Sequence, residues 1–175
     1  GLVTTLQPGD VSFTAVTKDM MDEVSASLDI SNYAETEMFF DDFDTADNFP
    51  GTTAANSELF VDKGKNSVYA GGMDWTDYAV ETTAKVASNG FSLWFRAQGP
   101  AANYLWQINE KEGNVLKTHV FTSASSFTQL PTVQLGDEYR PGEYNKLKVV
   151  VLGNRIMTYV NDVLVQERSE ERRVG

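Results

Sequence analysis

Trp94 and Arg96 are the residues of this chain whose types and spacing best suit ligand binding. They stand two positions apart in a predicted strand over residues 91–97, where they alternate with Leu93 and Phe95. Successive side chains of a strand point to opposite faces, so Trp94 and Arg96 share the face away from the apolar stripe. A flat indole ring and a guanidinium with several N–H donors suit a ligand with apolar C–H faces and hydroxyl edges, as a sugar has. The pattern predicts a binding surface rather than a catalytic centre.

Four residues on the preceding and following predicted strands extend this candidate site. Glu81 and Thr83 are expected to face the same way as Trp94 and to hold ligand hydroxyls. Tyr104 and Trp106 are the other two, although they could equally belong to a buried stripe. The predicted ligand-binding residues are therefore Glu81, Thr83, Trp94, Arg96, Tyr104 and Trp106.

A structural interpretation of the same residues stays open. Trp94 could pack under a loop, and Arg96 could pair with a structural carboxylate. Trp75 and Tyr78, at the start of a predicted strand, are expected to fill the core rather than to bind a ligand. The exposure of Trp94 and Arg96 decides between the two interpretations.

Residues arranged for catalysis are not evident. Retaining glycosidases need two carboxylates about 5 Å apart, and no predicted strand carries the alternating Glu-x-Asp-x-Glu pattern that could supply them. No serine stands in a Gly-x-Ser-x-Gly elbow, and His119 is the one histidine of the chain. We expect His119 to be a hydrogen-bonded strand residue and the chain not to be an enzyme.

Four aspartates close together in the sequence provide the oxygen atoms that calcium prefers. They lack the spacing and the distal glutamate of an EF-hand loop. Metal-bound and merely solvated carboxylates are both open at this point. These residues are Asp41, Asp42, Asp44 and Asp47.

Composition and charge narrow the function further. The chain has 175 residues, which corresponds to a single domain, and a formal net charge of −11. Nucleic acids require a basic surface, so this charge argues against them and against anionic membranes. The chain has no cysteine and hence no disulfide or cysteine metal site. No apolar run approaches the ~20 residues that span a bilayer.

Short alternating segments fill the chain from about residue 57 onward, and Gly-, Pro- and Asn-containing turns separate them. Strands at this spacing, without helical patterns between them, predict an all-β sandwich or barrel. The last three are the clearest, because Gly153-Asn154 and Asn161-Asp162 suit tight hairpin turns. The predicted strands cover residues 58–62, 67–70, 78–86, 91–97, 103–109, 115–121, 146–152, 155–160 and 163–167.

The first forty residues allow several structures. Residues 19–28 have apolar residues at helical spacing, which Val24 and the serines weaken, and residues 4–16 and 37–43 could be extended. The region is a short helix, a strand pair or the tail of a preceding domain. We therefore divide the chain into an N-terminal extension or linker over residues 1–37, a β-sandwich over residues 38–168 and a tail over residues 169–175. The abrupt start and the charged end indicate a piece of a larger polypeptide.

With these strands laid out, the chain resembles the concanavalin A-like jelly-roll modules, the group that includes laminin-G-like, levan-binding-module-like and 3-keto-glucoside hydrolase-type domains. It departs from the group at Asn161-Asp162, where Asn-Gly is more usual, and in its long N-terminal extension. The matching segments are FFDDFD at residues 39–44, WTDY at 75–78, GFSLWFR at 90–96, YLWQI at 104–108, YNKLKVVVLGNRI at 144–156 and YVND at 159–162.

The resemblance implies a two-sheet antiparallel jelly-roll β-sandwich, to which the N-terminal region could add one short helix. It also implies a structural calcium ion, held by Asp42 and Asp44 together with backbone carbonyls. No other cofactor is required. Modules of this group bind sugars, mediate adhesion or, in a few cases, act as enzymes, so the resemblance gives a class of function rather than an activity.

We expect a non-catalytic carbohydrate-binding module of a larger, secreted or cell-surface bacterial protein that acts on glycans. Its partners would be a polysaccharide or oligosaccharide and the covalently linked catalytic or surface domains of the same polypeptide, with no nucleic acid and no membrane. We expect a monomer. The alternatives are a structural spacer in a multidomain glycosidase and a glycoside-acting hydrolase domain.

Overall fold

Strands are the regular secondary-structure elements of the described part of the chain. The computed structural model describes residues 2–18, 23–69, 71–72, 74–97 and 103–169, with side chains from Glu37 onward. These residues form strands and no helix, which confirms the predicted all-β class. The strands are β1 Leu2–Lys18, β2 Glu23–Phe40, β3 Thr53–Ala55, β4 Glu58–Phe60, β5 Tyr78–Lys85, β6 Gly90–Phe95, β7 Asn103–Asn109, β8 Val115–Ser123, β9 Ser126–Gln129, β10 Val133–Gln134, β11 Tyr144–Leu152, β12 Arg155–Val160 and β13 Val163–Ser169.

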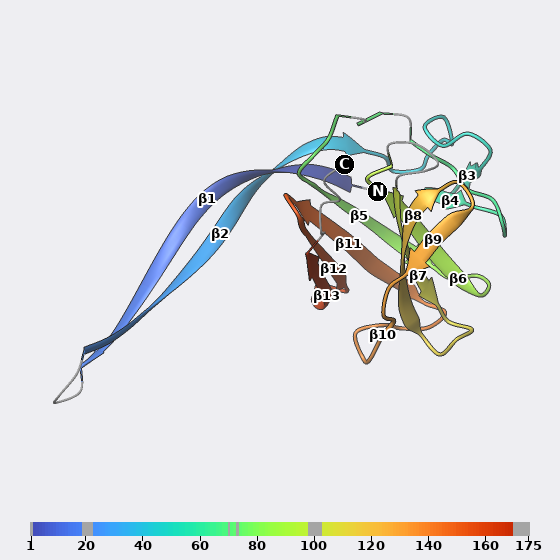
Figure 1. The fold of residues 1–175 in the computed structure, drawn as a ribbon. Coiled ribbons are helices and arrows are strands. Elements are labelled where there is room, and N and C mark those ends of the chain that lie inside the picture. Colours follow the sequence, from blue (N-terminus) through green and yellow to red (C-terminus); the bar gives the residue numbers. More distant parts are fainter. Residues whose placement is uncertain (1, 19–22, 70, 73, 98–102, 170–175) are drawn as a thin grey trace.

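The strands form two main sheets that face each other (Figure 1). The six-stranded sheet has the order β13-β12-β11-β5-β1-β2, and the five-stranded sheet has the order β10-β8-β7-β6 with β9 also paired to β8. The short strands β3 and β4 pair with each other. Every strand pair among the described residues is antiparallel. The predicted two-sheet jelly-roll β-sandwich is therefore confirmed.

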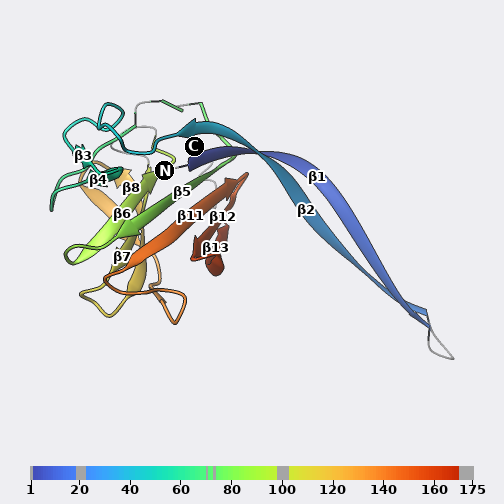
Figure 2. The same cartoon turned by 180° about the vertical axis from the view of Figure 1, so that it is seen from behind.

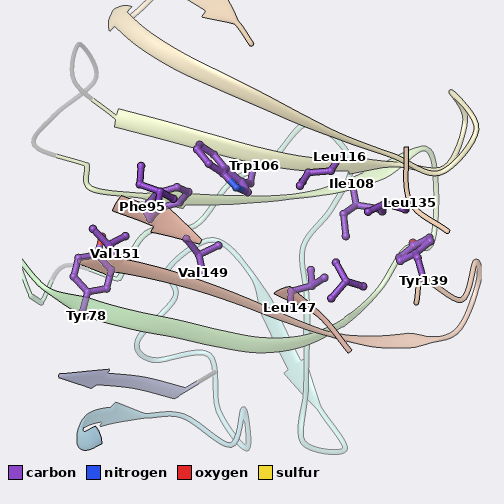
Figure 3. Close-up of a cluster of buried hydrophobic side chains, with 12 residues drawn as sticks. Tyr78, Phe95, Trp106, Ile108, Leu116, Leu135, Tyr139, Leu147, Val149 and Val151 are labelled. Atoms are coloured by element: carbon purple, nitrogen blue, oxygen red, sulfur yellow. The ribbon is translucent and has the colours of Figure 1, made fainter. Parts of the chain in front are cut away.

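The core lies between the two sheets (Figure 3). Alternate residues of each strand point inward, as the period of a strand requires. Burying a large apolar side chain contributes about 1.5–3 kcal/mol relative to leaving it exposed, so this layer supplies most of the favourable free energy of the sandwich. Phe95, Trp106, Ile108 and Leu116 come from the five-stranded sheet, and Tyr78, Leu147, Val149 and Val151 from the six-stranded sheet.

Two buried hydrogen bonds join the sheets across this core. The Trp106 Nε1–H donates to Thr158 Oγ1 at 2.5 Å. The Thr118 hydroxyl donates to Gln166 Oε1 at 3.0 Å. All four residues are buried, and a buried polar group without a partner is costly. These pairs therefore favour one relative placement of the sheets.

The predicted meander at the carboxyl end is confirmed. β11, β12 and β13 pair in sequence, with Val149 opposite Thr158 and Thr158 opposite Gln166. The turns between them need positive φ, which Gly153 supplies at +54° and Asn161 supplies at +47°.

The first two strands form a long hairpin that leaves the sandwich (Figures 1 and 2). Leu2–Thr5 pair with β5, and from Leu6 to Lys18 strand β1 pairs with β2 alone. We call the paired stretch from Leu6 to Glu35 the arm. The extended strand pair foreseen for this region is present, and residues 23–28 are strand rather than helix, while residues 19–22 lie outside the described part. Val24, Ala26 and Leu28 alternate with serines, and this period of two explains the strand.

No helix among the described residues is long and apolar enough to cross a membrane.

Candidate functional site

The structure separates the residues predicted to form one site. Glu81 and Thr83 lie on the outer face of the six-stranded sheet, because Val80 and Ala84, which alternate with them, pack on the core. Trp94 lies on the outer face of the five-stranded sheet. The expectation that Glu81 and Thr83 face the same way as Trp94 is therefore wrong. Strands β5 and β6 follow each other in the chain but belong to different sheets, and the turn between them crosses the edge of the sandwich.

Tyr104 and Trp106 lie on the inner face of β7. Trp106 is 3% exposed, and the half-buried Tyr104 ring stacks on Phe95 at 5.6 Å between centroids. Neither ring faces a ligand on the outside of the sheet, which corrects their prediction as binding residues. The other possibility given by the sequence, that Tyr104 and Trp106 belong to the buried stripe of the strand, is therefore correct.

Arg96 fastens the end of β6 to the opposite sheet. Its φ of +49° ends the strand alternation, so its side chain does not continue the face that Trp94 occupies. The guanidinium donates a hydrogen bond of 2.6 Å to the carbonyl oxygen of Gly153, in the turn between β11 and β12. The backbone N–H of Arg96 donates to the hydroxyl of the buried Tyr78 at 2.8 Å. The structural interpretation thus holds for Arg96, which has the Gly153 carbonyl among its partners.

Glu81 takes part in an ion-pair group on the outer face of the six-stranded sheet. The ammonium group of Lys146 lies 3.4 Å from a Glu81 carboxylate oxygen and 2.9 Å from one of Asp162. The hydrogen bond to Asp162, followed by the charge of Glu81, raises the pKa of Lys146. Glu81 therefore serves this charge network, and Thr83 beside it is exposed.

Trp94 belongs to an aromatic row on the outer face of the five-stranded sheet. Its ring centroid lies 4.9 Å from that of Phe121 on β8, and Phe121 lies 5.2 Å from Phe127 on β9. Trp94 is 38% exposed and Phe127 is 50% exposed. We call Trp94, Phe121 and Phe127 the aromatic row. It presents apolar ring surface to solvent from three strands, β6, β8 and β9, on one face of the sheet.

Sequence reasoning missed two members of this row. Phe121 has the parity of the outer face, since it is two residues from His119, and this could have been read from the alternation in β8. Phe127 lies in β9, a short and polar strand that the hydrophobic pattern did not reveal.

His119 lies beside the row, on the same outer face of β8. It is 8% exposed and contacts the Phe127 ring edge-to-face at 4.8 Å, and its Nδ1 atom is buried without a hydrogen-bond partner among the described residues. Burial lowers the pKa of this imidazole, so the neutral form is favoured. His119 is a strand residue, as predicted, but the expected hydrogen bond to its buried Nδ1 atom is absent within the described part of the chain.

A polar strip continues the same face next to the aromatic row. The amide of Gln107 donates to the Ser92 hydroxyl at 3.3 Å, and Asn109 donates to Gln107 at 3.4 Å and to Glu112 at 2.9 Å. Lys117 forms an ion pair with Glu112. We call Ser92, Gln107, Asn109, Glu112 and Lys117 the polar strip. Flat apolar rings and an adjacent line of hydroxyl and amide groups are the two components that a sugar-binding surface combines.

The acidic segment after β2 uses its carboxylates in hydrogen bonds within its own loop and to the neighbouring turn between β3 and β4. Asp42 accepts a hydrogen bond from the backbone N–H of Asp44 at 3.1 Å, and Asp44 accepts one from the Ser57 hydroxyl at 2.7 Å. The segment lines an open hollow of about 290 Å³. No group of three or more carboxylate, histidine or cysteine side chains with metal-binding geometry occurs among the described residues. Calcium takes six to eight oxygen ligands and accepts backbone carbonyls among them, so a calcium ion held by Asp42 and Asp44 with backbone carbonyls stays a prediction.

Comparison with known proteins places the chain in a family. The sequence model of the 3-keto-alpha-glucoside-1,2-lyase-like domain matches residues 35–174. The chain belongs to this family. The comparison with curated proteins found no match. Among solved structures, the carbohydrate-binding module CBM66 from Bacillus subtilis is similar at 18% sequence identity with a TM-score of 0.46, over 55% of this chain and 60% of that module.

In this member of the 3-keto-alpha-glucoside-1,2-lyase-like family, the carboxylate of Glu110 has a structural task. One of its oxygens accepts hydrogen bonds from the Tyr139 hydroxyl at 2.7 Å and from the backbone N–H of Gly142 at 2.9 Å. Burial, with Glu110 as the second cause, raises the pKa of Tyr139 well above its usual value. Glu110 therefore anchors the loop before β11.

Proposed function

We propose that this domain binds carbohydrate, without catalysing a reaction, on the outer face of its five-stranded sheet. The observation that carries this proposal is the aromatic row with the polar strip beside it. The half-exposed rings of Trp94 and Phe127 offer stacking surface that the fold of the sandwich does not require. Exposed apolar surface next to polar groups is typical of a binding site.

Binding combines stacking with hydrogen bonding. The C–H face of a sugar ring lies on Trp94, which removes apolar surface of both partners from water. The hydroxyl of Ser92 and the amide of Gln107 then exchange part of their mutual hydrogen bond for ligand hydroxyls. A shallow site of this kind binds weakly, with Kd on the order of micromolar to millimolar.

Weak binding is useful when the domain is one part of a longer protein. We propose that the parent is a secreted or cell-surface bacterial protein and that the domain is a monomer within it. Linkage to a catalytic or surface domain converts weak binding into a raised effective concentration of that domain at the polysaccharide.

Substitution of Trp94 tests the proposal. W94A should weaken binding at least ten-fold in affinity electrophoresis and calorimetry with a panel of polysaccharides, because the stacking surface is lost. F60A is the matched control, since Phe60 is also an exposed aromatic residue but lies on β4. If W94A binds as well as the wild type, or the folded wild type binds no member of the panel, the proposal fails.

The name of the family favours a second candidate, an enzyme that acts on glycosides. Members are described as 3-keto-alpha-glucoside-1,2-lyase-like, so a 3-keto-α-glucoside is the substrate to try. Release of the aglycone by the purified domain, followed by chromatography, would favour this candidate over binding alone. A folded domain that neither binds nor releases sugar would be a structural spacer, a role consistent with the attachment of Arg96 to the opposite sheet.

A further inference from the structure

We infer that the arm is the closing hairpin of a second domain, which precedes the sandwich in the same polypeptide, and that one face of the arm completes the apolar core of that domain. The inference goes beyond the proposed function and does not depend on sugar binding. Three observations support it: the pattern of residue types along the arm, the lack of a third strand beside it, and the boundary of the family.

The pairing register sorts the residues of the arm into two faces. Residues directly opposite each other in an antiparallel pair share a face, and the next pair along the strands belongs to the other face. Four alternate pairs are apolar apart from Thr17: Val11 with Ile30, Phe13 with Leu28, Ala15 with Ala26, and Thr17 with Val24. The pairs between them are polar apart from Val16: Asp10 with Ser31, Ser12 with Asp29, Thr14 with Ser27, and Val16 with Ser25. We call the first set the apolar face of the arm.

This pattern is typical of strands that cover one side of a core. Antiparallel strands with one face packed and one face in water show a clean alternation of apolar and polar residues. Burial of a large apolar side chain contributes about 1.5–3 kcal/mol, and a spacer that stays in water gains none of it. The apolar face of the arm therefore indicates a packed partner.

The arm has no further strand beside it within the described residues. Figures 1 and 2 show it running away from the sandwich. From Leu6 onward β1 pairs with β2 alone, and β2 pairs with β1 alone. A hairpin of two strands is marginally stable in water and needs further strands or a packed face. A folded domain that includes the arm supplies both.

The boundary of the family indicates where this domain lies in the chain. The match to the 3-keto-alpha-glucoside-1,2-lyase-like model begins at residue 35, where the arm ends. The arm is therefore outside the family domain and on its amino-terminal side. The closing hairpin of a preceding domain occupies this position in a polypeptide.

A second copy of the chain is a poorer partner for the apolar face of the arm. Four alternate pairs cover roughly 25 Å of a ribbon roughly 10 Å wide. Two stacked arms would thus bury about 500 Å² in total, well below the roughly 1,200 Å² of a stable interface. A covalently linked domain needs no such area, because linkage makes the contact intramolecular.

Hydrogen exchange compares this chain with the natural polypeptide that carries it. In this chain, the amides of residues 10–18 and 23–31 should exchange at least 100-fold faster than those of β11 and β12. In the natural polypeptide, the same arm amides should gain at least 100-fold in protection, while sedimentation velocity shows a monomer. Strong protection of the arm in this chain, protection that appears only on dimerisation, or no gain in the natural polypeptide would overturn the inference.

Substitutions at neighbouring positions of β1 test which face is packed. In calorimetry of the natural polypeptide, F13D should abolish the unfolding transition of the preceding domain or lower its midpoint by at least about 5 °C, because it buries a charge. T14D is the matched control, since Thr14 belongs to the polar face, and its midpoint should stay within about 2 °C. The transition of the sandwich should be the same in both variants.

Equal effects of F13D and T14D on the preceding domain overturn the inference. A natural polypeptide without any unfolding transition besides that of the sandwich overturns it too. None of these measurements involves a sugar, so the proposed function can fail while this inference stands, and the reverse.

Discussion

Thr158 is the residue at which a small change should reveal how the two sheets are joined. T158V keeps the shape of the side chain but leaves the Trp106 N–H buried without its acceptor. An unsatisfied buried donor costs about 1–3 kcal/mol, so we expect the free energy of unfolding to fall by that amount in urea denaturation. T83V is the control, because Thr83 is exposed on β5, and its effect should stay within about 0.5 kcal/mol. Equal effects of the two variants would contradict a stabilising role for the cross-sheet bond.

His119 should make the stability of the domain depend on pH. Burial lowers its folded-state pKa below the value of about 6.5 expected in the unfolded chain. As pH falls through this value, the unfolded chain takes up the proton first, so stability is lost on acidification. We expect the wild type to lose more stability than H119Q between about pH 7 and pH 5 in urea denaturation. Parallel pH profiles for the two proteins would exclude this role.

The residues also show what alternation along a strand can predict. Alternation correctly placed Trp94 on an outer face of the sheet. It did not determine whether Trp106 points inward or outward, because that depends on which face of the strand packs against the second sheet. Arg96 does not follow the alternation of β6 because its φ is positive. The spacing of apolar residues does not predict such a local backbone conformation. The pairing of Glu81 with Lys146 in place of a ligand depends on which strand lies next to β5, and sequence order does not give this.

Strands whose structure depends on nearby residues were predictable from the sequence, and strands whose structure depends on distant residues were not. The strands β11 to β13 were predictable, since their hairpin turns are short and their residues alternate. The assignment of β5 and β6 to different sheets was not, because it depends on packing across the whole sandwich. The short strand β9 was missed because its residues are polar and its pairing to β8 alone makes it a strand.

The arm should be dispensable for folding of the sandwich. Replacing residues 7–34 with Asn-Gly keeps the facing pair Leu6 and Glu35 and closes it with a favoured hairpin turn. Since the arm beyond Thr5 pairs only with itself, we expect cooperative unfolding with a midpoint within a few degrees of the wild type. V3P, which removes a donor where β1 pairs with β5, should lower the midpoint. Loss of cooperative unfolding in the shortened chain would show that the sandwich depends on the arm.

The acidic loop after β2 gives an element-scale prediction about metal. Its aspartates are engaged by backbone and hydroxyl donors of the same loop and its neighbour. We therefore expect the thermal midpoint to be the same in calcium chloride and in EDTA, measured by calorimetry. A higher midpoint with calcium that D42N abolishes would establish the calcium site that the family resemblance implies.

At the scale of the whole molecule, the arm makes the domain larger than its chain length suggests. A compact chain of 175 residues has a radius of gyration of about 16 Å. The stretch from Leu6 to Lys18 extends about 40 Å at the rise of a strand. Small-angle X-ray scattering should give a radius several ångströms above the compact value, and the shortened chain should return to it. A compact radius for the wild type would mean that the arm folds back on the sandwich.

The projecting hairpin also makes rotation in solution direction-dependent. A body with a thin extension turns readily about its long axis and slowly about the two perpendicular ones, since viscous drag grows steeply with length. Nitrogen-15 relaxation rates in the sandwich should then vary with the angle between each N–H bond and that axis. Amides of the strands that run along the extension and amides of those that cross it would fall into separate groups, even though all belong to one rigid core.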